Sequence, residues 1–136
     1  MPLLQVGDRR LQMSVAPRRG RTVYRLTTSP PGVDAAVKVL INMNTSTRPW
    51  HPHVFTDAPD CQRHRYSDGS LCMWWGRDTD VHRWVLADGF AALVHYIDIH
   101  LYQEACCRAG EPWPGDEAPG SHPRRRSCTT CGGEGR

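Results

Sequence analysis

The sequence HRYSDGSLCMWWGRDTDVHRW spans residues 64–84 and lies between the predicted strands and the predicted helix of the chain. Cys72 follows a predicted turn at residues 67–69 and precedes a tryptophan-rich segment. The glycine of this turn adopts backbone angles that other residues resist. Leu71 and Met73 flank Cys72 with apolar side chains, so we expect this segment to be anchored against a core.

Two hypotheses fit Cys72. A cysteine between apolar residues is often buried and behaves as a small hydrophobic side chain. A nucleophilic cysteine instead needs a fixed backbone, surroundings that favour the thiolate, and a hydrogen-bond donor for a developing oxyanion. His64 and Tyr66 are the nearby candidates for that donor, although Tyr66 could equally pack beneath the loop. The local pattern leaves both hypotheses open.

Upstream of residue 64, the sequence predicts a meander of short antiparallel strands. Residues 22–27 alternate and are rich in β-branched side chains, which is typical of a strand. The Pro-Pro-Gly sequence at residues 30–32 predicts a turn. Residues 35–42 and 50–55 predict the next two strands, and two short apolar segments predict a hairpin within residues 1–20.

Downstream of Trp84, the period of the apolar pattern changes from two residues to about 3.6 residues, which predicts an amphipathic helix over residues 86–109. Gly110 is the expected C-terminal stop. The predicted apolar stripe consists of Leu86, Phe90, Leu93, Val94, Ile97 and Leu101, with His95, Asp98 and Gln103 off it. We expect this helix to lie across the sheet and to supply most of the buried area.

The composition fits one soluble domain. The chain has 136 residues, of which 39% are hydrophobic and 23% charged. No segment approaches the roughly 18 apolar residues of a membrane span, and the N-terminus lacks the apolar core of a signal peptide. These features predict a cytoplasmic protein that does not bind a membrane.

The net charge of +3 comes almost wholly from arginine, and Lys38 is the single lysine. Arginines cluster in residues 9–10, 18–21 and 124–126. Such clusters contact phosphates or acidic protein surfaces, or they remain solvated. Nucleic-acid binding is not expected, because it would need aromatic residues interleaved with the basic ones.

The six cysteines are Cys61, Cys72, Cys106, Cys107, Cys128 and Cys131. Because nothing in the sequence indicates secretion, we expect reduced thiols. The Cys128-x-x-Cys131 pair is half of a zinc site, which would need two further ligands, such as Cys106, Cys107 or His122. We predict no metal and no cofactor, with a small zinc or thiol module as an alternative. No nucleotide-binding motif is present.

The order of these motifs resembles that of the ubiquitin-conjugating enzymes, and more narrowly of their short prokaryotic members. A proline-rich segment at residues 49–55 precedes His64, and Gly-Ser-Leu-Cys-Met at residues 69–73 fits the active-site context of the family. The Trp-Pro segment at residues 110–115 resembles the one that closes the short members. The resemblance covers roughly residues 22–122.

The resemblance implies an α/β (α+β) domain with the UBC-like fold. Its expected parts are a short antiparallel β-meander, an active-site loop, and one long helix packed on the sheet. Residues 1–21 are then an N-terminal extension or short hairpin, residues 22–122 the UBC-like domain, and residues 123–136 a basic flexible tail that contains cysteine and glycine.

The resemblance also implies acyl transfer through Cys72. Cys72 would receive a ubiquitin-like modifier as a thioester from an activating enzyme and pass it to an amine of a protein substrate. No strong general base is needed, because an amine attacks a thioester readily. His64 matches the histidine of the family's His-Pro-Asn signature, whereas Arg65 and Tyr66 replace its Pro and Asn. A non-catalytic domain that binds a modifier or partner is the alternative, although such members lack the cysteine.

Overall fold

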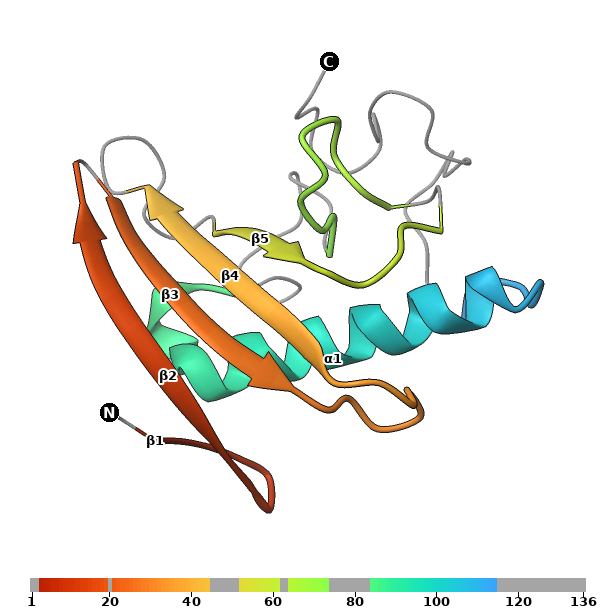
Figure 1. Ribbon diagram of the computed structural model, residues 1–136, viewed down its shortest axis with the longest axis horizontal. Helices are drawn as coiled ribbons and strands as arrows, with labels where there is room; N and C mark the ends of the chain where they lie inside the picture. Colours follow the sequence, from red (N-terminus) through yellow and green to blue (C-terminus); the bar gives the residue numbers. More distant parts are fainter. Residues whose placement is uncertain (1–2, 20, 45–51, 62–63, 74–83, 115–136) are drawn as a thin grey trace.

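The computed structural model describes residues 3–19, 21–44, 52–61, 64–73 and 84–114. These residues form five strands and one long helix (Figure 1). The elements are β1 (Leu3–Val6), β2 (Arg9–Arg18), β3 (Arg21–Thr28), β4 (Val37–Asn44), β5 (His53–Thr56), the short 3-10 turn η1 (Leu86–Asp88) and α1 (Gly89–Arg108). The prediction of an α+β fold is confirmed. Within this part of the chain, no helix is both long and apolar enough to span a membrane.

The five strands form one antiparallel sheet in the order β1-β2-β3-β4-β5. The predicted N-terminal hairpin is present as β1 and β2, with Gly7 in its turn at a φ of 62°. Pairing of Met13 with Leu26 and of the following residues joins β2 to β3. The hairpin therefore extends the sheet and does not stand apart from it.

One face of the sheet is covered by α1, which crosses the strands (Figure 1). Strand residues alternate between the two faces, so Val39 and Ile41 of β4 and Val54 of β5 point toward the helix and are buried. They form one core cluster with four fully buried residues of α1, which are Leu93, Val94, Ile97 and Leu101. Each such side chain contributes roughly 1.5–3 kcal/mol through its burial.

Local contacts explain where α1 begins and where it ends. Trp84 is fully buried before the helix, and its Nε1 donates to the carbonyl oxygen of Gly89 at 2.7 Å. At the other end, Gly110 has a φ of 86°, and its amide donates to the carbonyl oxygen of Cys107 at 3.0 Å. This left-handed glycine ends the helix, as the sequence predicted.

The prediction that Asp98 lies off the buried stripe is wrong, because Asp98 is only 4% exposed. Its carboxylate forms an ion pair with Arg9 of β2 and accepts a hydrogen bond of 2.8 Å from the hydroxyl of Thr28 in β3. A buried carboxylate is tolerated when it has such partners. Both partners are far away in the sequence, so helical periodicity alone could not identify them.

Two isoleucines of α1 test the assignment of the buried face. Ile97 is fully buried, whereas Ile99 is 42% exposed. We expect Ile97→Ala to lower the free energy of unfolding by about 2–5 kcal/mol, because it leaves a cavity in the core. The matched change Ile99→Ala should cost less than about 1 kcal/mol. Urea denaturation measures both, and equal losses would contradict this packing.

Candidate active site

Residues 64–73 form a compact loop after β5, and its two arms are hydrogen-bonded to each other. The amide of Cys72 donates to the carbonyl oxygen of His64, and the amide of Tyr66 to that of Ser70, both at 2.9 Å. Between the arms, the amide of Gly69 donates to the carbonyl oxygen of Tyr66, and Gly69 has a φ of 92°. The predicted turn at residues 67–69 is therefore present.

The loop is attached to the sheet through the residue before Cys72. The amide of Leu71 donates to the carbonyl oxygen of Val54 in β5 at 2.8 Å. The Leu71 side chain is 3% exposed and belongs to the main core cluster, and the partly buried Met73 packs against that cluster. The predicted anchoring of Cys72 by these two neighbours is confirmed.

Asp68 stabilises the turn. Its Oδ1 accepts hydrogen bonds from the amide and the hydroxyl of Ser70, at 2.9 Å and 2.6 Å. Partial burial would raise the pKa of Asp68, but these two hydrogen bonds, together with the nearby His53, outweigh it and lower that pKa below its ordinary value. Asp68 is therefore an ionised turn residue at neutral pH.

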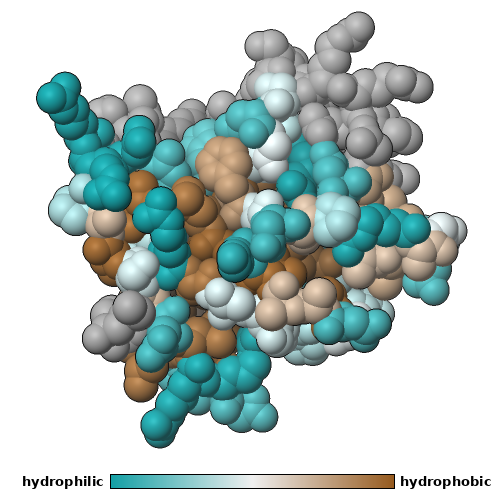
Figure 2. All heavy atoms as spheres, in the orientation of Figure 1, coloured by the Kyte–Doolittle hydropathy of each residue, from teal (hydrophilic) through white to brown (hydrophobic). Residues whose placement is uncertain are grey.

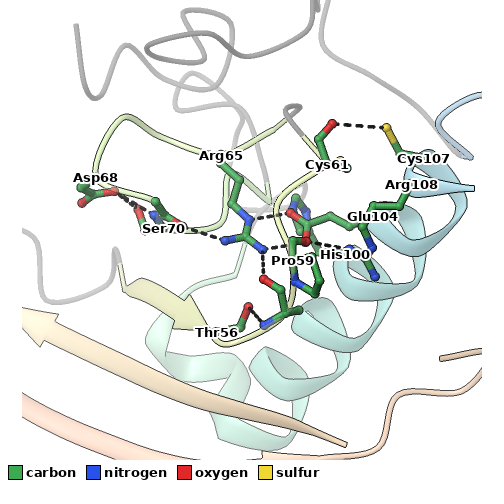
Figure 3. Close-up of polar contacts among 12 residues, drawn as sticks. Thr56, Pro59, Cys61, Arg65, Asp68, Ser70, His100, Glu104, Cys107 and Arg108 are labelled. Atoms are coloured by element: carbon green, nitrogen blue, oxygen red, sulfur yellow. Dashed lines mark hydrogen bonds and ion pairs between the residues drawn. The ribbon is translucent and has the colours of Figure 1, made fainter. Parts of the chain in front are cut away.

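A buried ion pair joins the loop to α1 (Figure 3). The guanidinium of Arg65 donates to both carboxylate oxygens of Glu104, with distances of 2.6 Å from Nε and 2.8 Å from Nη2. The two side chains are only 6% and 0% exposed. Arg65 also donates to the carbonyl oxygens of Gly69 and Ala58, at 3.1 Å and 3.3 Å. One side chain thus fixes the turn, the preceding segment and the helix.

The two partners keep each other ionised. Burial would lower the pKa of Arg65, but the hydrogen bond and the charge of Glu104 raise it overall. Burial would likewise raise the pKa of Glu104, but hydrogen bonds with Arg65 and His100 lower it overall. His100 lies one turn earlier on α1, with its Nε2 at 3.2 Å from Oε2 of Glu104. The bidentate geometry explains why charge prevails over burial.

His64 has a strained backbone at the start of the loop. Its φ of 57° is the one positive value for a non-glycine residue in the described parts of the chain. The centre of its ring lies 4.3 Å from that of Trp113, which in turn lies 5.3 Å from the ring of His100. The residues after α1 therefore cover the loop, and Gln103 holds them by donating to the carbonyl oxygen of Pro114 at 2.8 Å. Such strain persists only where neighbouring contacts enforce it.

The expectation of six reduced thiols is wrong for Cys72, which is disulfide-bonded. Cys61, Cys106 and Cys107 are not disulfide-bonded, so the partner of Cys72 lies outside the described residues. Cys72 is 4% exposed and forms a small buried cluster with Tyr66, separate from the main core. A disulfide sulfur cannot act as a thiolate nucleophile, so acyl transfer at Cys72 would require prior reduction.

The three candidate site residues Cys72, His64 and Tyr66 lie on one loop. The backbone amide of Cys72 is hydrogen-bonded to the carbonyl oxygen of His64, and its side chain packs beside Tyr66. Arg65 and Glu104, which hold this loop, were not predicted from the sequence. A signal for Glu104 was present, because it lies three residues after Leu101 and continues the buried stripe. A charged residue at such a position implies a buried partner of opposite charge.

One group of described residues has the spacing of a metal site. Ligand atoms of Asp60, Cys61 and Glu104 lie within 4.8 Å of one another. However, both carboxylate oxygens of Glu104 bind Arg65, whose guanidinium also interacts electrostatically with Asp60 and Cys61. The positive charge of this cluster is supplied by Arg65, so we derive no metal chemistry from it. Cys128, Cys131 and His122, the candidate ligands of the alternative zinc module, lie outside the described residues.

Comparison with known proteins found no matching protein-family model, no matching curated protein and no matching solved structure. A function for this chain is therefore inferred from its sequence motifs and from the geometry of the loop.

The Arg65–Glu104 pair predicts a specific effect of charge removal. Glu104→Gln leaves a buried, unpaired guanidinium, so we expect a loss of about 3–5 kcal/mol in the free energy of unfolding at neutral pH. Glu111→Gln is the matched control, because Glu111 is exposed. The loss should shrink in acid. The folded-state pKa of Glu104 is lowered, so its contribution is complete above the ordinary value of 4.5 and is lost as the pH falls below it. Equal, pH-independent effects of both changes would contradict the pair's role.

The strained backbone of His64 can be tested separately from its ring contacts. His64→Ala and His64→Gly both remove the ring, but only glycine adopts a positive φ without a steric penalty. We expect the glycine variant to be more stable by about 1 kcal/mol. At His53 in β5 the order should reverse, because glycine weakens a strand. Thermal unfolding of the four variants measures this, and an alanine advantage at residue 64 would contradict the strain.

Proposed function

We propose that this chain is a ubiquitin-conjugating-enzyme-like acyl carrier, and that reduced Cys72 is its nucleophile. The order of its parts supports the proposal. An antiparallel meander leads into a short loop that carries Cys72, and a long helix follows and packs on one face of the sheet. The expected pattern of Gly-x-Leu-Cys lies at the end of this loop.

The observation that carries the proposal is the fixed backbone around Cys72. Hydrogen bonds attach Cys72 to His64 and Leu71 to β5, and the Arg65–Glu104 pair attaches the same loop to α1. Acyl transfer benefits from such order, because a nucleophile and oxyanion donors that are held in place need no rearrangement during reaction.

The proposed chemistry has two acyl transfers. In the first, the Cys72 thiolate attacks the carbonyl carbon of a ubiquitin-like modifier held as a thioester on an activating enzyme. A new carbon–sulfur bond forms, and the thiolate of the activating enzyme leaves. In the second, an amine of a protein substrate attacks the same carbon and loses a proton to solvent, an amide forms, and Cys72 leaves as thiolate. Both steps require that a thiol reductant has first opened the disulfide of Cys72.

His64 and Tyr66 have different proposed roles. His64 shapes the loop, because its carbonyl oxygen binds the amide of Cys72 and its ring packs against Trp113. Tyr66 occupies the position at which the resemblance places an oxyanion-stabilising Asn, and it is packed with Cys72. We propose that one of these two side chains donates to the oxyanion after the disulfide is opened.

The alternative function is a non-catalytic domain that binds a modifier or another partner. The burial of Cys72 and its disulfide favour this alternative, because both make the sulfur a structural group in the form described here. The two functions differ in whether Cys72 becomes reactive once it is reduced.

A non-reducing gel distinguishes them. Protein is reduced, freed of reductant, and mixed with ATP, its cognate activating enzyme and the ubiquitin-like modifier. We expect a modifier adduct that a thiol reductant removes. Cys72→Ser should give at most a reductant-resistant oxyester, because oxygen then replaces sulfur at the carbonyl. Cys61→Ser is the matched control at a cysteine that is not disulfide-bonded, and it should leave the adduct unchanged.

The side-chain roles are tested in the same assay by rates. His64→Ala or Tyr66→Phe should slow transfer by about 10²–10³-fold if that side chain is the oxyanion donor. An adduct that survives Cys72→Ala would exclude Cys72 as the carrier. If no adduct forms although the reduced protein binds the modifier, the non-catalytic alternative is correct.

A further inference from the structure

The face of the sheet opposite α1 carries an open groove with a volume of about 750 Å³. Because strand residues alternate between faces, Lys38 and Leu40 point away from the helix while Val39 and Ile41 point toward it. All the residues that line the groove belong to β2, β3, β4, β5 or the residue after β5. The groove is therefore separate from the loop that carries Cys72.

The strand register arranges the groove in rows. Arg25 of β3 pairs with Leu40 of β4, and Leu40 pairs with Phe55 of β5, so a cation and two apolar side chains lie side by side across the sheet. Lys38 lies in the next row on β4, two residues from Leu40. In Figure 2 apolar side chains lie between hydrophilic ones over the strands. Among the residues that line the groove, Leu40 and Phe55 are apolar, whereas Arg25 and Lys38 are charged.

The groove has an excess of positive charge. Arg10, Arg25 and Lys38 line it and are exposed, and the described part of the chain contains no ion-pair partner for them. Arg9, which points to the other face, is by contrast engaged with Asp98. Asp57 is the one carboxylate among the lining residues, and its Oδ1 accepts a hydrogen bond of 2.9 Å from the backbone amide of Lys38.

We propose that this groove binds an acidic segment of a partner protein that carries an apolar side chain. The apolar side chain packs on Leu40 and Phe55, and carboxylates on either side of it pair with Arg25 and Lys38. Arg10 receives a further carboxylate near β2. Asp57 repels acidic groups at the β5 edge, which gives the bound segment a preferred direction. Complementary charge of this kind determines specificity and association rate.

The lining residues favour a protein segment over a nucleic acid. Single-stranded nucleic acids bind sheet faces through several aromatic platforms on which the bases stack. Phe55 is the single aromatic residue that lines this groove, and it is partly buried. The apolar surface of Leu40 suits an aliphatic side chain better than a base. The proposal goes beyond acyl transfer and does not depend on the reactivity of Cys72.

Fluorescence anisotropy tests the proposal with a labelled synthetic peptide in which glutamates flank a single leucine. We expect saturable binding that weakens as salt is added. Two comparison probes are the same peptide with glutamine in place of glutamate and a labelled oligodeoxythymidine. Binding of the glutamine peptide with equal affinity, or tighter binding of the oligonucleotide, would overturn the assigned chemistry. Failure of the glutamate peptide to bind would overturn the site.

Variants locate the binding. Arg25→Glu combined with Lys38→Glu should lower the affinity for the glutamate peptide by about tenfold or more, because the attraction between the groove and the peptide becomes repulsion. Arg19→Glu and Arg108→Glu combined make the same charge change at exposed arginines outside the groove and should have little effect. Circular dichroism checks that both proteins are folded. Equal weakening by the two double variants would overturn the site. Cys72→Ser should bind as the unaltered chain does, so failure of acyl transfer leaves this test unaffected.

Discussion

The buried ion pair between Arg65 and Glu104 is the interaction on which the geometry of the candidate site depends. Replacing a whole buried pair with apolar residues is often neutral, but removing one partner leaves an unpaired charge and is strongly destabilising. The main effect of the pair is therefore to fix the position of the loop on α1, and its net contribution to stability is smaller. Because Arg65 also binds the carbonyl oxygens of Gly69 and Ala58, loss of Glu104 would disturb the turn before Cys72 as well as the contact with α1.

The charged side chains on the two faces of the sheet differ in whether they form ion pairs. On the face covered by α1, Asp98 and Glu104 are buried and paired with Arg9 and Arg65, which fixes the helix on the sheet and the loop on the helix. On the other face, Arg10, Arg25 and Lys38 have no such ion-pair partner among the described residues. The adjacent arginines at residues 9 and 10 are divided between these faces by strand alternation alone. Two adjacent arginines in the sequence therefore lie on opposite faces, with Arg9 paired to Asp98 and Arg10 lining the groove.

Local patterns predicted the elements well and the polar contacts poorly. The alternation at residues 22–27, the stripe through Leu93 and Ile97, and the stop at Gly110 depend on neighbours in sequence, and the structure confirms them. The burial of Asp98 and the ion pair of Glu104 depend on partners 89 and 39 residues away, which no local pattern contains. The disulfide of Cys72 depends on the approach of a distant sulfur and contradicted an expectation based on the absence of a secretion signal.

Amide hydrogen exchange at Cys72 tests most directly whether the ion pair holds the loop. The amide of Cys72 donates a hydrogen bond to the carbonyl oxygen of His64, while the amides within α1 and β3 are hydrogen-bonded within those elements. In Glu104→Gln, under conditions where the protein remains folded, we predict a large loss of protection at Cys72 and Leu71 relative to β3. Uniform loss across the loop, α1 and β3, or unchanged protection at Cys72, would contradict the account.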